Sequence, residues 1–125
     1  MTPEDQYALL VDALRLVAAS PEQQVSSLPD FVCVTDEVSS MYLDAHLLVP
    51  QLEGAALVPA QAVAAINLLA AHFEAMPDEV PLVDAERAGS HPFWADARAL
   101  ATESLRLLGE ERRPPTFAGV TWVKG

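Results

Sequence analysis

Apolar residues recur at intervals of three and four along most of the chain, the spacing that places side chains on one side of an α-helix. The pattern predicts four main helices, over residues 3–19, 36–49, 59–76 and 92–108. Helix-starting and helix-stopping residues stand at their ends, such as Thr2 and Pro3 before the first and Gly109 after the last. We therefore predict an all-α fold, a single-domain bundle of about four main helices with antiparallel neighbours.

The segment between the first two main helices predicts a further short helix and an apolar strut. Residues 20–23 repeat the start signature of the chain, so a helical piece is expected as far as Ser27. Residues 30–34 are β-branched and apolar, and we expect them to fill the core, with Cys33 as a small buried side chain. Thr35 or Asp36 is then expected to cap the next helix.

The remaining connections are predicted as turns and loops. Pro50 is expected to end the second main helix, and Gly54 to centre a turn over residues 52–57. Residues 77–90 form an acidic, proline-containing loop, with Ser90 as the cap of the last helix. The aromatic tail, residues 113–125, is expected to dock on the bundle through Phe117 and Trp122.

The helix over residues 59–76 is the most apolar of the four. It carries Val63, Ile66, Leu69 and Phe73 on one side and few polar residues opposite. A helix that is apolar all round is usually central or lies in a subunit interface. One alternative function is therefore a structural or homo-oligomeric subunit that is built on this helix.

Length and composition limit the protein class. A chain of 125 residues with 51% hydrophobic composition forms one domain with a core of its own. The single cysteine excludes an intramolecular disulfide. The sequence has no basic leader and no apolar stretch of the roughly 18 residues that span a bilayer. We therefore expect a cytoplasmic protein without membrane contact, as a monomer or a homodimer.

Charge is distributed unevenly along the chain, whose net charge is −11. The first 86 residues hold fourteen carboxylates and one basic residue, Arg15, whereas the last 39 hold six basic and four acidic residues. An acidic surface attracts basic partners and repels nucleic acid. We therefore expect a basic protein partner and no nucleic-acid binding, with arginines of the last helix and its exit pairing with the acidic helices.

No motif for catalysis or metal binding is found. Phosphate loops, nucleophile elbows, Cys-x-x-Cys and His-Glu-x-x-His are missing from the sequence. His46, His72 and His91 each lack the carboxylate three residues earlier that a di-iron helix pattern requires. We expect no metal, no cofactor and no enzymatic activity. A second alternative function is a small-molecule binder whose pocket is lined by His46 or His72 and a partner acid.

Two stretches carry a family resemblance: residues 29–38 (PDFVCVTDEV), and residues 90–98 (SHPFWADAR) leading into LRLLG at 105–109. Together they resemble a class of small, acidic, helical bacterial proteins without assigned chemistry. In size and charge these are similar to the immunity proteins of bacterial toxin systems, which bind and block a cognate toxin. No binding residue is carried over from this resemblance.

The predicted function is a non-catalytic acidic protein-binding domain, of the immunity type, that inhibits a basic toxin or nuclease. The candidate contact surface is a set of acids near the second helix and in the acidic loop, with Tyr42 as an aromatic anchor. These acids are Asp30, Asp36, Glu37, Asp44, Asp78, Glu79, Asp84 and Glu86. The competing explanation is that the acids only keep an alanine-rich bundle in solution.

Overall fold

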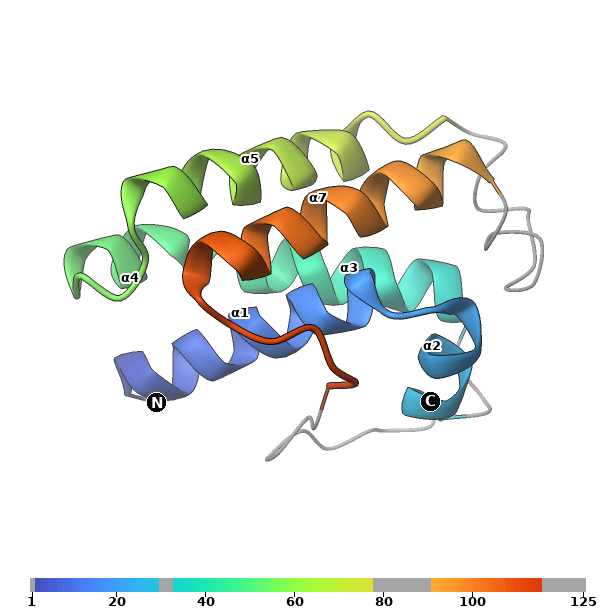
Figure 1. Ribbon diagram of the computed structural model, residues 1–125, viewed down its shortest axis with the longest axis horizontal. Helices are drawn as coiled ribbons and strands as arrows, with labels where there is room; N and C mark the ends of the chain where they lie inside the picture. Colours follow the sequence, from blue (N-terminus) through green and yellow to red (C-terminus); the bar gives the residue numbers. More distant parts are fainter. Residues whose placement is uncertain (1, 30–32, 78–90, 116–125) are drawn as a thin grey trace.

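Every regular element in the computed structural model, which describes residues 2–29, 33–77 and 91–115, is an α-helix (Figure 1). The long helices are α1 (Pro3–Ala18), α3 (Val34–His46), α5 (Ala60–Glu74) and α7 (Pro92–Leu108), and the short ones are α2 (Pro21–Ser27) and α4 (Val49–Gly54). The all-α prediction is confirmed.

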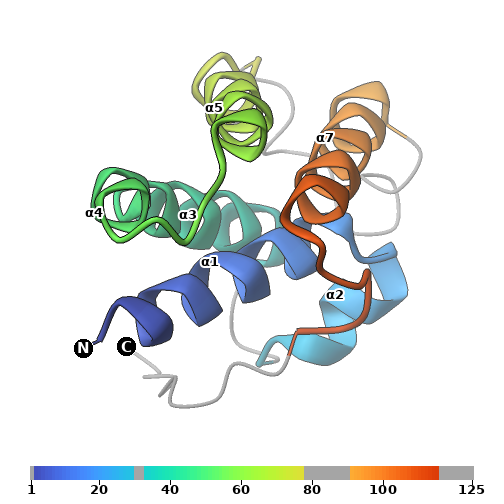
Figure 2. The same cartoon turned by 60° about the vertical axis from the view of Figure 1, so that its left-hand side comes forward.

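Helix α1 is the central element of the fold. Its residues 10–18 are all buried, because α3 packs against one side of it and α7 against another. Figure 2 shows α1 between these two helices. Helix α5 packs against α3 and α7 and keeps an exposed outer side. Of the two alternatives for residues 59–76, the central position is corrected here, because the central helix is α1, and the subunit interface stays a prediction.

An aromatic cluster joins α3, α5 and α7 in the core. The ring of Phe73 lies 5.6 Å from that of Tyr42, 5.9 Å from that of Phe93 and 5.8 Å from that of Trp94. These four side chains are at most 7% exposed. Burial of aromatic side chains of this size is a main source of stability in a domain of this length.

Local capping follows the sequence signals at three helix ends. Thr2 forms a capping box with Asp5 at the start of α1, and Ser20 forms one with Gln23 at the start of α2. Gly109 adopts a left-handed conformation, with φ of +75°, and ends α7. These ends were predictable because each depends on residues within a few positions.

Helix α3 begins earlier than predicted, at Val34, with Cys33 as its N-cap and without a side-chain cap. Neither Thr35 nor Asp36 caps it. Including Val34 in the helix turns Thr35 inward with Val38, and both are buried. Cys33 is exposed, so the prediction that it is a buried hydrophobe is wrong.

The α3–α4 corner also differs from the prediction. Helix α3 ends at His46, and Pro50 lies in the first turn of α4, where its missing N–H leaves no helical hydrogen bond unmade. The expected turn at Gly54 is instead the end of α4, and Ala56 takes the positive φ, at 59°. At the last helix the N-cap is His91, rather than Ser90.

Beyond α7, residues 110–113 cross α1 (Figure 1). The Tyr7 hydroxyl donates to Glu110 at 3.4 Å, and burial, followed by the nearby Glu110 carboxylate, raises the pKa of Tyr7. Arg15 Nε donates to the Glu111 carbonyl at 3.0 Å. The start of the tail therefore docks on α1, whereas Phe117 and Trp122 lie outside the described residues.

Candidate protein-binding surface

One side of α3 presents an exposed row that we call the α3 stripe: Asp36, Ser40, Asp44 and Leu47. Steps of four, four and three residues place these side chains along one side of the helix. The opposite side buries Val38, Tyr42 and Ala45. Glu37 is half-buried beside the stripe, which ends on a leucine that is 72% exposed.

Arg15 and Arg106 are used elsewhere in the fold. Arg15, 7% exposed, pairs with Glu110 at 3.5 Å, and Arg106 pairs with Glu103 one turn away on α7. The second contact lowers the pKa of Glu103 through its hydrogen bond to Arg106. Among the residues that the structure describes, no basic group pairs with an acid of α3. The predicted pairing of Arg106 with the acidic helices is therefore wrong, because Arg106 has a closer acid on its own helix.

A small pocket lies at the end of the α3 stripe, and we call it the corner pocket. It has a volume of about 240 Å³ and is lined by His46, Leu47, Val49, Pro50, Glu53 and Asn67. His46 Nε2 and Asn67 Oδ1 are 2.8 Å apart, which ties the end of α3 to α5. Leu47 belongs to both features, so the stripe leads directly into the pocket.

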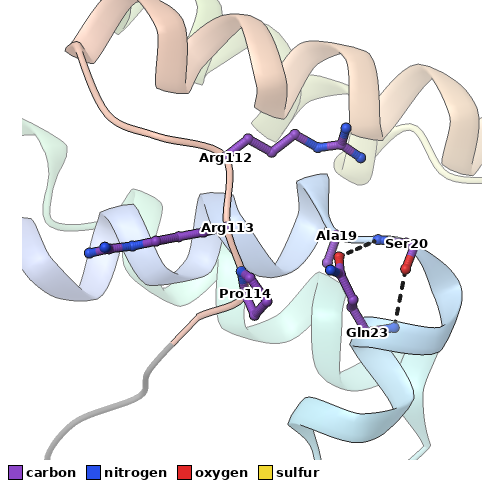
Figure 3. A pocket seen from close by; sticks show the side chains of 6 residues that line it. All are labelled: Ala19, Ser20, Gln23, Arg112, Arg113 and Pro114. Atoms are coloured by element: carbon purple, nitrogen blue, oxygen red, sulfur yellow. Dashed lines mark hydrogen bonds between the residues drawn. The ribbon is translucent and has the colours of Figure 1, made fainter.

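A second pocket, of about 400 Å³, lies where the tail passes the junction of α1 and α2 (Figure 3). It is lined by Ala19, Ser20, Gln23, Arg112, Arg113 and Pro114. Arg112 donates through Nε and Nη2 to the Ala18 carbonyl, at 3.0 and 2.7 Å. A cation at this end of α1 is favourable because the last carbonyls of a helix carry partial negative charge.

The two arginines do not form a clamp for an anion. Figure 3 shows their side chains pointing in opposite directions along the fold. The Ser20 hydroxyl already accepts the Gln23 N–H, and the Gln23 side chain accepts the Ser20 N–H. Arg112 therefore has a structural role, in which it fastens the tail to the end of α1.

Tyr42 does not lie on the surface, so its prediction as a partner-binding anchor is wrong. Its side chain is 0% exposed, and its hydroxyl donates to the Ile66 carbonyl of α5 at 2.7 Å. Tyr42 lies one turn beyond Val38 on α3, and the same helical period that exposes Asp44 turns it inward.

The structure places three of the eight predicted acids. Asp36 and Asp44 are exposed, Glu37 is half-buried, and all three belong to α3. The other five, Asp30, Asp78, Glu79, Asp84 and Glu86, lie outside the described residues. The acidic surface that can be described is therefore the one on α3.

The histidines make structural contacts. His72 Nε2 donates to the Phe93 carbonyl at 2.8 Å, and its ring stacks on Phe93 with centroids 4.1 Å apart. His91 Nδ1 accepts the Phe93 N–H at 3.1 Å and so caps α7. Over residues 2–29, 33–77 and 91–115, no three potential metal-ligating side chains come together, and no helix is long and apolar enough to cross a bilayer.

Sequence reasoning missed Leu47 and the corner pocket. A signal for Leu47 was present, because this leucine follows Asp44 by three positions and so shares its side of the helix. The pocket had no such signal, since α5 contributes Asn67 across the fold.

Comparisons of the chain with protein-family models, curated proteins and solved structures find no match.

Proposed function

We propose that the protein is a non-catalytic binding module that docks a basic partner protein along the α3 stripe. The observation that supports this most directly is the exposure of Asp36 and Asp44 without an internal cation, on a side that ends at Leu47. Carboxylates that only solubilise a fold need no neighbouring exposed leucine. An acidic row that leads to an apolar contact has the two components of a protein-binding surface.

Charge complementarity would act mainly on the rate of association. The net charge of −11 attracts a basic partner over long distances, and this attraction weakens as salt screens it. The apolar contact at Leu47 would instead slow dissociation, because breaking it exposes apolar surface to water. The partner that we propose is a basic toxin or nuclease, in keeping with the sequence resemblance, and the protein would act as its immunity-type inhibitor.

The test compares capture by the wild type with capture by a variant that carries Asp36→Asn, Glu37→Gln and Asp44→Asn. Each protein is immobilised and exposed to a lysate of the source organism at low and at high salt. The captured basic protein is then purified, and its Kd is measured for each variant. Removal of these three charges, two of them exposed and one half-buried, is expected to lower the affinity about tenfold.

A matched control carries the same change of charge away from α3. The substitutions Glu22→Gln, Asp96→Asn and Glu111→Gln alter exposed acids of α2, α7 and the tail. This control is expected to retain the affinity of the wild type within about twofold, since charges beyond the Debye length are screened. Equal losses in both variants would mean that net charge alone matters, and capture of no basic protein at either salt would refute the proposal.

A second candidate function is self-association through the outer side of α5. This side exposes Ala64, Ala71 and Ala75 around Leu68, which is 61% exposed. A dimer that used it would sediment at twice the monomer mass, and Leu68→Glu would return it to a monomer. A wild type that sediments as a monomer at high concentration would remove this candidate.

A further inference from the structure

We infer that the corner pocket receives an arginine side chain of the basic partner. This inference rests on the proposed function and adds the chemistry of one contact to it. The pocket lies at the end of the α3 stripe, so a chain that follows Asp36 and Asp44 arrives there. Its walls and its single acid match the two parts of an arginine side chain, an apolar stem and a cationic end.

The apolar part of the pocket is made by three residues at the α3–α4 corner. All three line the pocket; Val49 is 3% exposed, whereas Leu47 and Pro50 are exposed. The methylene groups of a long basic side chain gain free energy by covering such a surface. Leu47 would therefore contact the methylene stem of one arginine, and this contact does not require a large apolar surface on the partner.

The acidic part of the pocket is Glu53. It lies on the same side of α4 as Val49 and Pro50, three or four residues further along, and it is exposed. Among the described residues it forms no ion pair. A guanidinium whose stem lies over Pro50 would bring its charge to this carboxylate.

The His46–Asn67 pair favours arginine over lysine. With Asn67 Oδ1 as acceptor, His46 Nε2 carries the proton, and Nδ1 keeps a lone pair that can accept from a further N–H group. Arginine presents five N–H donors in one plane, stacks on aromatic rings and is more weakly hydrated than lysine. A guanidinium at the edge of the His46 ring, in the plane of that ring, could therefore donate to Nδ1 and to the Glu53 carboxylate together.

The test is an NMR titration of the ¹⁵N-labelled protein with a capped pentapeptide, Ala-Ala-Arg-Ala-Ala. The matched ligand replaces arginine by citrulline, which has the same shape without the charge. Concentrations extend to about 20 mM, where a millimolar complex is nearly saturated. We expect shifts at the amides of His46, Leu47 and Glu53 and at the Asn67 side chain, with tighter binding of the arginine peptide.

Two protein variants complete the test. Glu53→Gln is expected to weaken binding of the arginine peptide by about twofold to threefold, the effect of one exposed charge pair, and to leave binding of the citrulline peptide unchanged. Glu22→Gln, on α2, is expected to change the affinity for neither peptide. Shifts of equal size for both peptides, shifts centred away from these residues, or an affinity that Glu53→Gln does not alter would each overturn the inference.

Failure of this inference is distinguishable from failure of the proposed function. If the α3 variant loses the captured partner while the arginine peptide does not bind, the stripe is an interface and the pocket is not an arginine site. If the peptide binds while the α3 variant and its control retain the partner equally, the pocket binds arginine and the stripe does not carry the interaction.

Discussion

The substitution Tyr42→Phe tests how α3 is held against α5. It removes one hydroxyl from a side chain that is 0% exposed and leaves the aromatic ring in place. The hydroxyl donates to the Ile66 carbonyl at 2.7 Å. The substitution therefore isolates one buried hydrogen bond between two long helices.

The expected loss near neutral pH follows from what remains after the substitution. Ile66 lies inside α5, so its carbonyl keeps the helical hydrogen bond from the N–H four residues later. The ring keeps its contact with Phe73, 5.6 Å away between centroids. A neutral hydrogen bond whose acceptor is not orphaned contributes about 1 kcal/mol to the free energy of unfolding.

At alkaline pH this difference is expected to disappear. Burial raises the pKa of Tyr42 far above its ordinary value of 10.0, so the folded protein keeps the phenolic proton that the unfolded chain releases. The contribution of the Tyr42 hydroxyl to the free energy of unfolding is complete below about pH 10. It falls as the pH rises, by up to about 1.4 kcal/mol per pH unit. Phenylalanine has no such proton, so the two proteins should be equally stable near about pH 11.

Urea unfolding followed by far-UV circular dichroism measures the difference in free energy of unfolding at neutral and at alkaline pH. Wild type and Tyr42→Phe are compared at about pH 7 and about pH 11, which cancels the titration of all other groups. The proposed role of Tyr42 would be refuted if the free energy of unfolding of Tyr42→Phe were about 3 kcal/mol or more below that of the wild type at neutral pH. It would also be refuted if this difference were unchanged at alkaline pH. Loss of partner capture by the stable variant would restore Tyr42 as a contact residue.

Two further predictions concern the end of α7 and the tail. Gly109→Ala is expected to lower the free energy of unfolding by about 1 kcal/mol, because alanine is strained at a φ of +75°; an unchanged urea midpoint would contradict this. Arg112→Ala removes both donors to the Ala18 carbonyl and is expected to cost about 1 kcal/mol, whereas Arg113→Ala, an exposed neighbour without that contact, is expected to cost almost nothing. Equal losses in the two arginine variants, measured in the same urea experiment, would show that the Arg112 contact does not stabilise the fold.

Local sequence signals were enough to place the helices and several of their ends. The capping boxes at Thr2 and Ser20 and the left-handed Gly109 depend on groups within about four residues of one another. The exposed side of α3 was also partly visible, since Asp44 and Ser40 follow the helical period. Such features need no knowledge of what lies across the fold.

Other features depended on which helices meet. Tyr42 and Leu47 are both large side chains on the α3 segment, yet one is buried and the other is 72% exposed, because α5 lies on only one side of it. Cys33 looked like core from its apolar neighbours and is exposed at a helix start. Composition alone could not decide these cases.

The amino-acid sequence by itself determined that the chain is helical, where its long helices run and that its carboxylates greatly outnumber its basic groups, since period, capping and charge are properties of neighbouring residues. Only the tertiary structure decided that α1 is central, that Arg15 and Arg112 are held by the tail and by the end of α1, and that His46, Glu53 and Asn67 share one pocket. Those outcomes arise from contacts between residues far apart in the chain, which form only when whole helices pack together.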